Sequence, residues 1–548
     1  MNTKYKYLFL LIFSLIGTSA CNDFDKINES PNDSKEPEAQ AIMSSILRNA
    51  VSLNFIGSDG TLTGGAHLHE RIHNINWDYY SQYMDLSGNG WSPRNYIPAD
   101  AYNSDYWDGS YQWLRSANSV ILYSKDNNLT QLARIWRVYI ESRITDYFGH
   151  VPFPGTDCLE RKNLDTEFAF KNQADIYDEF FSELTDAASK IDPSKPGLSA
   201  GDIYYSGDMA KWYRFANTLH LRLALRISEV DPDKAKKEAK KALQRGTMQS
   251  GDDLQMPATD GWGNQYNYTM YQINWGEKML MTKSMENILI GLGGMAYDGT
   301  ATQAPPIVDP RGSLMFDPSV EGGKWEGIVP GLPTDEHAGQ SINYAYLGKA
   351  VVGTTEAPNS YRKLDAFLYT EACFLRAEAY HRWPELGNAK NAYNDGISAS
   401  FAQWGIAGKE NVYIASIDKN VNGTSVAYDD QSGAGNSALE KIITQKYIAG
   451  YPDGSLEAWN DKRRLNLPNL LVPKYKDPST YSNTDKDPTK SANFIKRMIY
   501  PAIEQTINND KYSAGIDLYS SKKDATSSNM WWDTNANYNT STYKYTDY

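Results

Sequence analysis

The sequence is poor in cysteine, with only three such residues in 548. Small secreted domains that depend on disulfides, and zinc sites built from thiolates, need more cysteines at regular spacings. A disulfide framework is therefore excluded as the main source of stability. Stability must come from a packed hydrophobic core, and the chain is long enough to bury one.

The chain also lacks an excess of basic residues. It has 54 lysines and arginines against 67 aspartates and glutamates, which gives a formal net charge of −13 at pH 7. Binding to the phosphate backbone of DNA or RNA requires a clustered basic surface. A nucleic-acid partner is therefore not expected.

Long apolar runs and common catalytic signatures are missing as well. The apolar run at residues 8–16 is about half of the ~20 residues that a membrane-spanning helix needs. The sequence contains no G-x-S-x-G, Walker or dinucleotide-binding signature. We therefore expect no cofactor, and an enzyme is the less favoured hypothesis.

The N-terminus has the pattern of an export signal. Lys4 and Lys6 precede the apolar run, which is followed by small residues directly before Cys21. This arrangement is typical of a cleaved signal peptide, and its ending resembles a lipobox, where the cysteine is acylated. We predict a signal peptide at residues 1–20, lipidation of Cys21, and membrane attachment of one domain, residues 21–548, through the acyl chains.

Several segments carry apolar residues at the spacing of one helix face, i, i+3, i+4 and i+7. Asp231 and Pro232 mark a helix start, because Asp is favoured at the N-cap and Pro at the first helical position. Ser437 and Glu440 form an S-x-x-E capping box that begins another helix. The amphipathic segments are 132–144, 176–191, 212–223, 364–379 and a last pair from Ser437 toward Trp459.

These segments predict a mainly α fold. Helices that arrive in pairs, with alanine where axes approach closely, resemble tetratricopeptide-type hairpins. No strict period of about 34 residues can be aligned, so an irregular helical domain stays open as the alternative. Residues 249–360 are rich in Gly, Pro, Asn and aromatics, which predicts long irregular loops that carry a binding surface. The polar segment 475–548 predicts loops and a poorly packed terminus.

One motif points to a different chemistry. Residues 69–73 read His69-Glu70-Arg71-Ile72-His73, an H-E-x-x-H sequence. On a helix, the two histidines fall on one face and can bind zinc while Glu70 polarises a water molecule. Arg71 is charged where zinc proteases are usually apolar, and no clear third ligand motif follows. The alternative is a helix whose histidines lie at the surface or make ordinary hydrogen bonds.

Further segments stand out in order along the chain. They are a helix from Arg134 that ends in Phe148-Gly149-His150-Val151-Pro152, a helix with Ala377-Glu378-Ala379, residues 443–449 followed by 457–464, and Tyr500-Pro501 with Glu504 and Asn508. Together with the lipobox, they resemble the SusD-like (SusD/RagB) family of outer-membrane nutrient-binding lipoproteins, especially its second branch. An arginine pair beside acids and a tryptophan is usually a buried cluster, so Trp459, Asp461, Arg463 and Arg464 are expected to be scaffold.

The resemblance implies a SusD-like α-helical scaffold with tetratricopeptide-like helix pairs and long irregular binding loops. It implies a non-catalytic protein at the cell surface, lipid-anchored in the outer membrane. Such a protein captures an oligosaccharide or polysaccharide and delivers it to a SusC-type TonB-dependent transporter. A SusD-like protein that binds peptides, and less favourably a zinc-dependent hydrolase that uses His69, Glu70 and His73, remain alternatives.

The aromatic content supports a surface that binds sugars. The chain has 39 Tyr and 14 Trp, and these side chains combine an apolar face with a polar tip. In starch-binding relatives, an early loop contributes a tryptophan followed by arginine and asparagine, which Trp91, Arg94 and Asn95 resemble. The predicted glycan-binding residues are Trp91, Arg94, Asn95 and Tyr96 in this loop, Trp262, Tyr266 and Trp275 in a second cluster, and Trp325 in a later loop.

Overall fold

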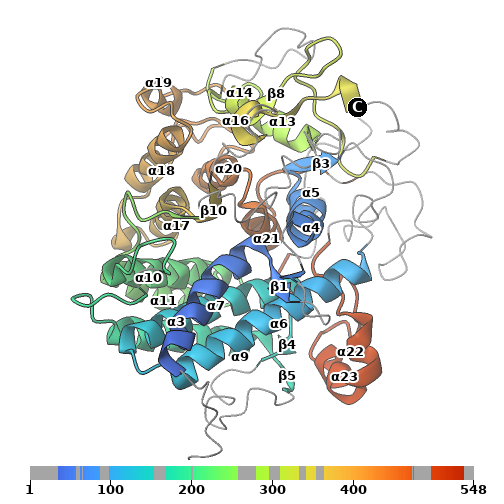
Figure 1. Ribbon diagram of the computed structural model, residues 1–548. Helices are drawn as coiled ribbons and strands as arrows, with labels where there is room; N and C mark the ends of the chain where they lie inside the picture. Colours follow the sequence, from blue (N-terminus) through green and yellow to red (C-terminus); the bar gives the residue numbers. More distant parts are fainter. Residues whose placement is uncertain are drawn as a thin grey trace, which may run out of the picture.

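The computed structural model describes residues 35–56, 62–63, 66–86, 98–153, 168–198, 201–256, 279–294, 309–332, 341–352, 363–471, 473 and 495–535. In these ranges the molecule is mainly helical and its strands are short (Figure 1). The predicted fold class is therefore confirmed. No helix of these ranges is long and apolar enough to cross a membrane.

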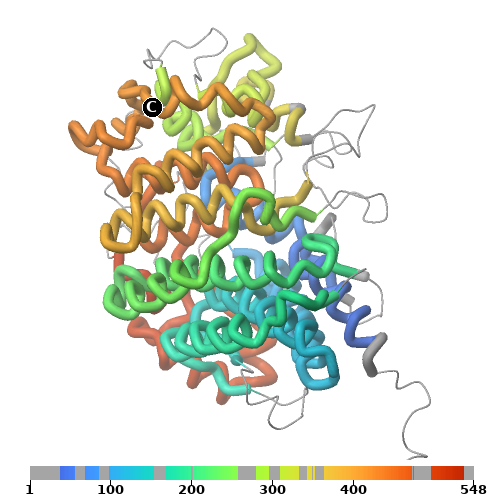
Figure 2. The backbone as a smooth tube through the Cα atoms, turned by 90° about the vertical axis from the view of Figure 1, so that its left-hand side faces the viewer, coloured from blue at the N-terminus to red at the C-terminus, as the bar shows by residue number. Residues whose placement is uncertain are grey.

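The first half of the chain forms a layer of long helices that pack on their sequence neighbours. Figure 2 shows them stacked in the lower part of the molecule. They are α3 (Lys35–Ser52), α6 (Asp100–Tyr123), α7 (Asn127–Phe148), α9 (Gln173–Lys190), α10 (Met209–Arg226) and α11 (Pro232–Arg245). Alanines at the contacts, such as Ala133 and Ala239, are fully buried, as predicted for paired helices.

Local sequence chemistry sets the ends of these helices. The Asp231 carboxylate accepts a hydrogen bond from the Lys234 N–H at 3.1 Å, and Pro232 begins α11. The Asp208 side chain caps α10 in the same way. At the end of α7, Gly149 has φ +90°, a conformation that favours glycine. The predicted caps are therefore confirmed.

The second helical group contains one correction. It comprises β10 (Leu364–Phe367), α17 (Tyr369–Arg382), η6 (Pro384–Leu386), α18 (Ala389–Gln403), α19 (Glu410–Ile414), α20 (Ala438–Gly450) and α21 (Ser455–Leu465). The helix predicted from residue 364 begins only at Tyr369. Residues 364–367 instead pair in antiparallel fashion with β6 (Leu254–Met256). The capping box of Ser437 and Glu440 is present at the start of α20.

A small antiparallel sheet lies at the top of the molecule in Figure 1, with the strand order β3-β7-β9-β8. Its strands are β3 (Met84–Leu86), β7 (Met279–Met281), β9 (Tyr346–Leu347) and β8 (Phe316–Asp317). Short elements surround it: α13 (Lys283–Leu289), α14 (Gly312–Met315), η5 (Ser341–Asn343) and α16 (Lys349–Val352). Three of these strands come from the region 249–360, where loops were predicted.

The remaining elements are short helices and two strand pairs from several parts of the chain. They are β1 (Phe55–Ile56) paired with β2 (Leu62–Thr63), α4 (Ala66–His69), η1 (Glu70–Trp77), α5 (Asp78–Ser81), β4 (Val151–Pro152) paired with β5 (Phe170–Lys171), α22 (Ala502–Ile507) and α23 (Asn509–Asp517). The poorly packed terminus predicted for 475–548 is wrong for residues 495–535. Trp532 is fully buried, and its indole N–H donates to Asp146 at 3.0 Å.

The motif residues assigned to the scaffold are buried. Arg464 donates to both carboxylate oxygens of Glu378, at 2.5 and 2.9 Å, and to Asp461 at 2.8 Å. The guanidinium of Arg463 lies 3.6 Å from the centre of the Trp459 ring. These contacts connect α17 and α21 inside the core, so the scaffold role of these residues is confirmed.

Candidate functional site

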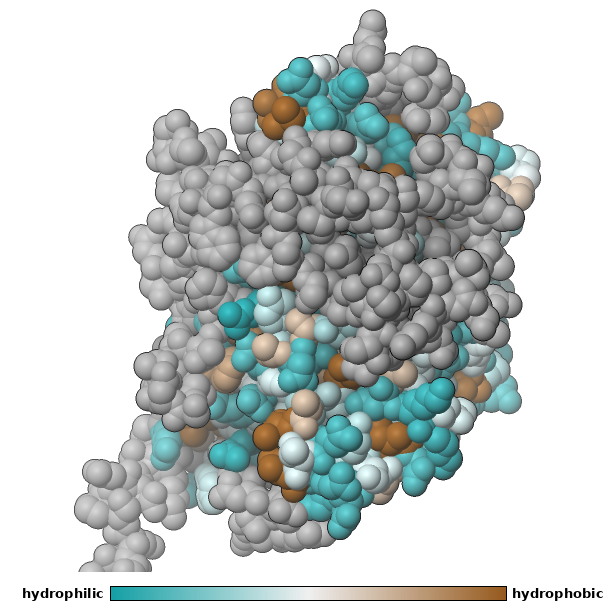
Figure 3. Space-filling model, turned by 90° about the vertical axis from the view of Figure 1, so that its right-hand side faces the viewer, coloured by the Kyte–Doolittle hydropathy of each residue, from teal (hydrophilic) through white to brown (hydrophobic). Residues whose placement is uncertain are grey.

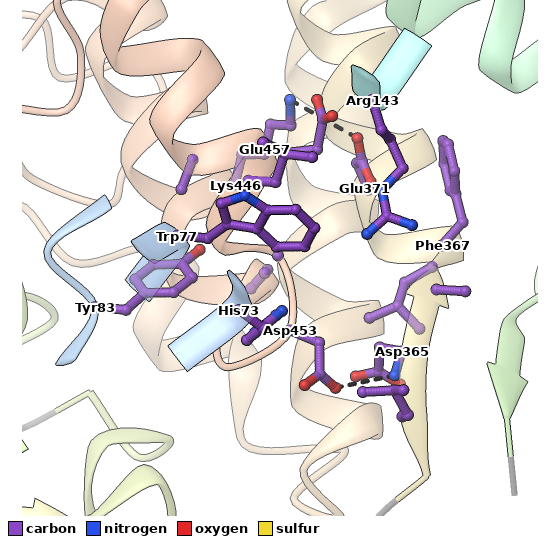
Figure 4. A pocket seen from close by; sticks show the side chains of 18 of the residues that line it. His73, Trp77, Tyr83, Arg143, Asp365, Phe367, Glu371, Lys446, Asp453 and Glu457 are labelled. Atoms are coloured by element: carbon purple, nitrogen blue, oxygen red, sulfur yellow. Dashed lines mark hydrogen bonds and ion pairs between the residues drawn. The ribbon is translucent and has the colours of Figure 1, made fainter. Parts of the chain in front are cut away.

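A cavity of about 80 Å³, lined by charged, aromatic and aliphatic side chains, lies between η1, α7, β10, α17, α20 and α21. Figure 4 shows His73 and Trp77 on one side, Arg143 and Phe367 on another, and Asp365 with Asp453 at a third position. A cavity of this size has room for roughly five water molecules. Because drug-sized ligands occupy about 300–1,000 Å³, this cavity does not hold an oligosaccharide.

Most charges in the cavity wall are paired. Arg222 donates to both oxygens of Glu371, at 2.9 and 2.6 Å, and Lys446 lies 2.9 Å from Asp461. Glu457 lies 2.5 Å from Arg226. Burial raises the pKa of Glu457, but the positive charges of Arg226 and Arg222 outweigh burial and hold this pKa well below its usual range. These pairs connect α10, α17, α20 and α21, so they stabilise the helix arrangement.

Sequence patterns did not reveal this cavity. Arg143 donates to the Ala50 carbonyl at 2.9 Å and lies over the rings of Trp77 and Tyr139, 5.0 and 5.2 Å from their centres. Such a stack of a cation on aromatic faces favours both partners. The only signal in the sequence was the H-E-x-x-H motif, whose two histidines line the same cavity.

The geometry of His69 and His73 does not fit a shared zinc ion. Both side chains are buried, so the histidines are not surface groups. His73 instead makes ordinary hydrogen bonds, with its Nε2 3.4 Å from the Pro452 carbonyl and from the Ser455 hydroxyl. His69 ends α4 and His73 lies on the π-helical turn η1, and their rings are stacked with 4.7 Å between centres and 15° between planes. Two zinc-bound imidazoles direct in-plane lone pairs to one point about 2.0–2.1 Å away, whereas nearly parallel rings direct them along parallel lines. In the described residues, no group of three or more His, Cys, Asp or Glu is placed to hold a metal.

The predicted glycan-binding residues fall into two sets. Trp91, Arg94, Asn95, Tyr96, Trp262, Tyr266 and Trp275 lie outside the described residues. Trp325 is described, and it lies in the hydrophobic core with 5% of its surface exposed. A ring packed this closely against protein has little face left for a sugar.

Aromatic residues that precede the predicted loop of Trp91 are also core residues. Tyr80 packs on Trp459 with 5.2 Å between ring centres, and the Tyr83 hydroxyl donates to the Tyr447 carbonyl at 2.6 Å. Trp77 is 1% exposed. The large aromatic content of this stretch therefore serves packing first, and its ligand-binding candidates reduce to residues 87–97.

The sheet fixes where the two predicted binding segments begin and end. We call residues 87–97 the early aromatic segment and residues 257–278 the late aromatic segment. The early segment follows Leu86 of β3 and the late segment precedes Met279 of β7, and these two residues are paired in the sheet. Paired residues of antiparallel strands are about 5 Å apart. One end of each segment is therefore attached to the scaffold at the same point.

The described residues thus define a helical scaffold with a small sheet. A family model described as SusD-like, SusD and RagB outer membrane lipoprotein, matches residues 26–533. The chain belongs to this family. No curated protein matches the sequence significantly.

Solved structures agree over nearly the whole chain. A SusD homologue from Parabacteroides distasonis is 40% identical, with 92% of this chain and 100% of that chain covered and a TM-score of 0.81. A chitin-binding SusD homologue from Flavobacterium johnsoniae is 25% identical, with 91% and 99% covered and a TM-score of 0.72. A SusD homologue from Bacteroides vulgatus is 24% identical, with 91% and 98% covered and a TM-score of 0.73.

Proposed function

We propose that this chain is a lipid-anchored protein of the cell surface that binds an oligosaccharide or polysaccharide and delivers it to a SusC-type TonB-dependent transporter. The observation that carries the proposal is the pairing of Leu86 with Met279 in a SusD-like scaffold. This pairing holds one end of each aromatic segment at the same point of the sheet, so that side chains of both segments can contribute to one surface.

The side chains of these segments suit a sugar ligand. Trp91, Trp262 and Trp275 supply flat apolar faces for the C–H faces of a pyranose ring, and Arg94 and Asn95 supply planar hydrogen-bonding groups for its hydroxyls. The Flavobacterium johnsoniae relative is a chitin-binding protein, which supports a glycan as the ligand class. The role is binding without catalysis.

Anchoring through Cys21 places this surface at the outer membrane, beside a transporter. The family is one of outer membrane lipoproteins, and acyl chains hold a protein on a membrane without a spanning segment. Replacement of Cys21 by Ala should release the protein into the soluble fraction. Retention of that variant in the membrane fraction would count against lipidation.

The binding function is tested with the purified full-length protein on an array that carries neutral and acidic polysaccharides together with a peptide library. We expect binding to at least one polysaccharide and to its oligosaccharides in a subsequent calorimetric titration. Binding to peptides alone would replace the glycan proposal by the peptide alternative. Hydrolysis of any bound substrate would show that the protein is an enzyme.

A further inference from the structure

A second cleft lies on a different part of the molecule from the sheet. Its volume is about 180 Å³, and it is bounded by α6, β4, β5, α22 and α23. In Figures 1 and 2, which share a vertical axis, these helices and strands lie in the lower half and the sheet lies near the top. The cleft is therefore separate from the point at which the two aromatic segments are attached.

The walls of the cleft are aromatic. Trp107 and Tyr111 lie one turn apart on α6, with 4.9 Å between ring centres. Phe170 faces Trp107 at 6.4 Å with 30° between the planes, and Phe168 and Pro152 complete this side. An apolar cavity of about 150 Å³ is enough to hold one benzene ring, so the cleft has room for one six-membered ring.

The aromatic walls are held in place by the scaffold. The Tyr111 hydroxyl donates to the Pro152 carbonyl at 2.6 Å, and Phe170 packs edge-on against Tyr500 at 5.1 Å. At Gly515 of α23, an added Cβ would lie 2.5 Å from the Phe170 ring, which shows how closely this helix approaches. The cleft is therefore built before any ligand arrives, which lowers the entropic cost of binding.

Polar groups gather at one side of the cleft. Glu504 of α22 is 7% exposed, and its carboxylate accepts a hydrogen bond from the Asn508 amide at 3.0 Å. Within the described ranges, no cation pairs with Glu504, and its charge adds to burial in raising the pKa of Tyr111. A buried carboxylate without a cation is costly unless hydrogen-bond donors solvate it.

From this arrangement we propose that the cleft is a second carbohydrate site, which takes one pyranose ring of a neutral glycan. The rings of Tyr111, Phe168 and Phe170 stack on the C–H faces of the sugar, and Glu504 and Asn508 bind its hydroxyls. Lys511 of α23 also lines the cleft, so the lining carries one charge of each sign and suits a neutral sugar. The inference rests on the proposed function only for the ligand class, and it does not depend on which loop residues bind the glycan.

A second site changes what the protein binds well. Two sites on one rigid scaffold raise the avidity for a polymer long enough to reach both, without any gain for a short oligosaccharide. The face that carries α22 and α23 shows apolar side chains among hydrophilic ones in its lower half (Figure 3). Ile503 and Ile507 of α22 and Leu518, which follows α23, are exposed apolar residues. They lie outside the cleft lining and provide control positions.

The test is saturation-transfer NMR of the full-length protein with methyl β-glucopyranoside and, separately, N-acetylglucosamine. All substitutions are made in the Trp91→Ala variant, the background protein, because it lacks the predicted main stacking residue of the first glycan site. Glu504→Gln and Phe168→Ala are added to it singly, and Ile507→Ala, on the same helix as Glu504 but 69% exposed, is the matched control. Gln keeps the shape of Glu, so melting temperatures of background and Glu504→Gln proteins should agree.

We expect the background protein to bind at least one of the two sugars. Each cleft substitution should weaken that binding about tenfold or more, and Ile507→Ala should leave it unchanged. Absence of binding in the background, or binding that both cleft substitutions leave intact, would overturn the second site. If the protein binds a glycan on the array but the cleft substitutions have no effect, only the second site is overturned. If the protein binds no glycan on the array and no sugar in the NMR experiment, the proposed function is overturned as well.

Discussion

Leu86 and Met279 are paired across β3 and β7, and they mark the points where the early aromatic segment leaves the sheet and the late aromatic segment enters it. The two residues are 193 positions apart in the sequence, as the difference of their numbers gives. Two clusters that the sequence offers as competing candidates are therefore attached side by side. One binding surface that draws on both is the simplest consequence.

This arrangement predicts coupling between Trp91 and Trp262. Each Trp→Ala change should weaken glycan binding roughly 30-fold, because a stacking aromatic of this kind contributes about 2 kcal/mol. If both rings contact the same ligand, the loss in the double variant should differ from the product of the single losses. Calorimetric titration of the four proteins measures this. Strictly multiplicative losses would show that the two residues contribute to binding without coupling to each other.

The buried pair of Glu378 and Arg464 predicts a large stability effect. Both side chains are 1% exposed, and removal of Glu378 leaves the buried Arg464 with Asp461 as its remaining carboxylate partner. Glu378→Gln should lower the free energy of unfolding by about 3–5 kcal/mol, measured by urea denaturation. Glu385, whose ion pair with Lys236 is largely exposed, is the matched control, and Glu385→Gln should leave the melting temperature unchanged. Equal effects of both changes would contradict this account of the core.

His150 predicts a specific acid sensitivity. Burial and the neighbouring Arg497 lower the pKa of His150 to about 4, and its Nδ1 accepts the Gln173 N–H at 3.0 Å. Between about pH 6.5 and pH 4 the unfolded chain binds this proton and the folded protein does not, so stability falls as the pH falls. The loss amounts to about 3 kcal/mol.

His150→Asn keeps an acceptor for the Gln173 N–H and removes the titration. The free energy of unfolding is measured at pH 7 and at pH 4 for both proteins. The decrease from pH 7 to pH 4 should be about 3 kcal/mol smaller in the variant than in the unmodified protein. The same pH dependence in both proteins would show that His150 is not the responsible group.

The stacked rings of His69 and His73 predict that the protein binds no structural or catalytic zinc at this motif. Metal analysis of protein purified without chelators should give zinc well below one ion per chain. His73→Gln should leave glycan binding unchanged, because the motif lines a cavity too small for the ligand. Stoichiometric zinc that disappears in the variant would revive the hydrolase hypothesis.

Features of the fold that depend on neighbouring residues could be predicted from the sequence. The caps at Asp231 and Ser437 use side chains two or three positions from the backbone groups they bind. The apolar stripe of α7 is recognisable because one face of one helix carries it. In each case the interacting atoms are close in the sequence, so local patterns suffice.

Features that depend on distant residues could not be predicted. Leu364 and Phe367 are spaced as on a helix face, but residues 364–367 form a strand because β6, more than one hundred positions earlier, pairs with it. Trp532 looks like part of a polar tail until its hydrogen bond to Asp146 is known. The cavity of Figure 4 likewise joins His73, Arg143 and Asp365 from elements far apart in the chain.

The most direct test of the central claim compares binding and melting in Trp91→Ala. The variant is titrated with the glycan that the unmodified protein binds on the array, and its melting temperature is measured by circular dichroism in the same buffer. We predict a loss of binding of roughly 30-fold or more with an unchanged melting temperature, and a smaller loss for Arg94→Ala. Full glycan binding by a normally folded Trp91→Ala protein would contradict the assignment of the early aromatic segment to the binding surface, and unfolding of the variant would show that Trp91 belongs to the core.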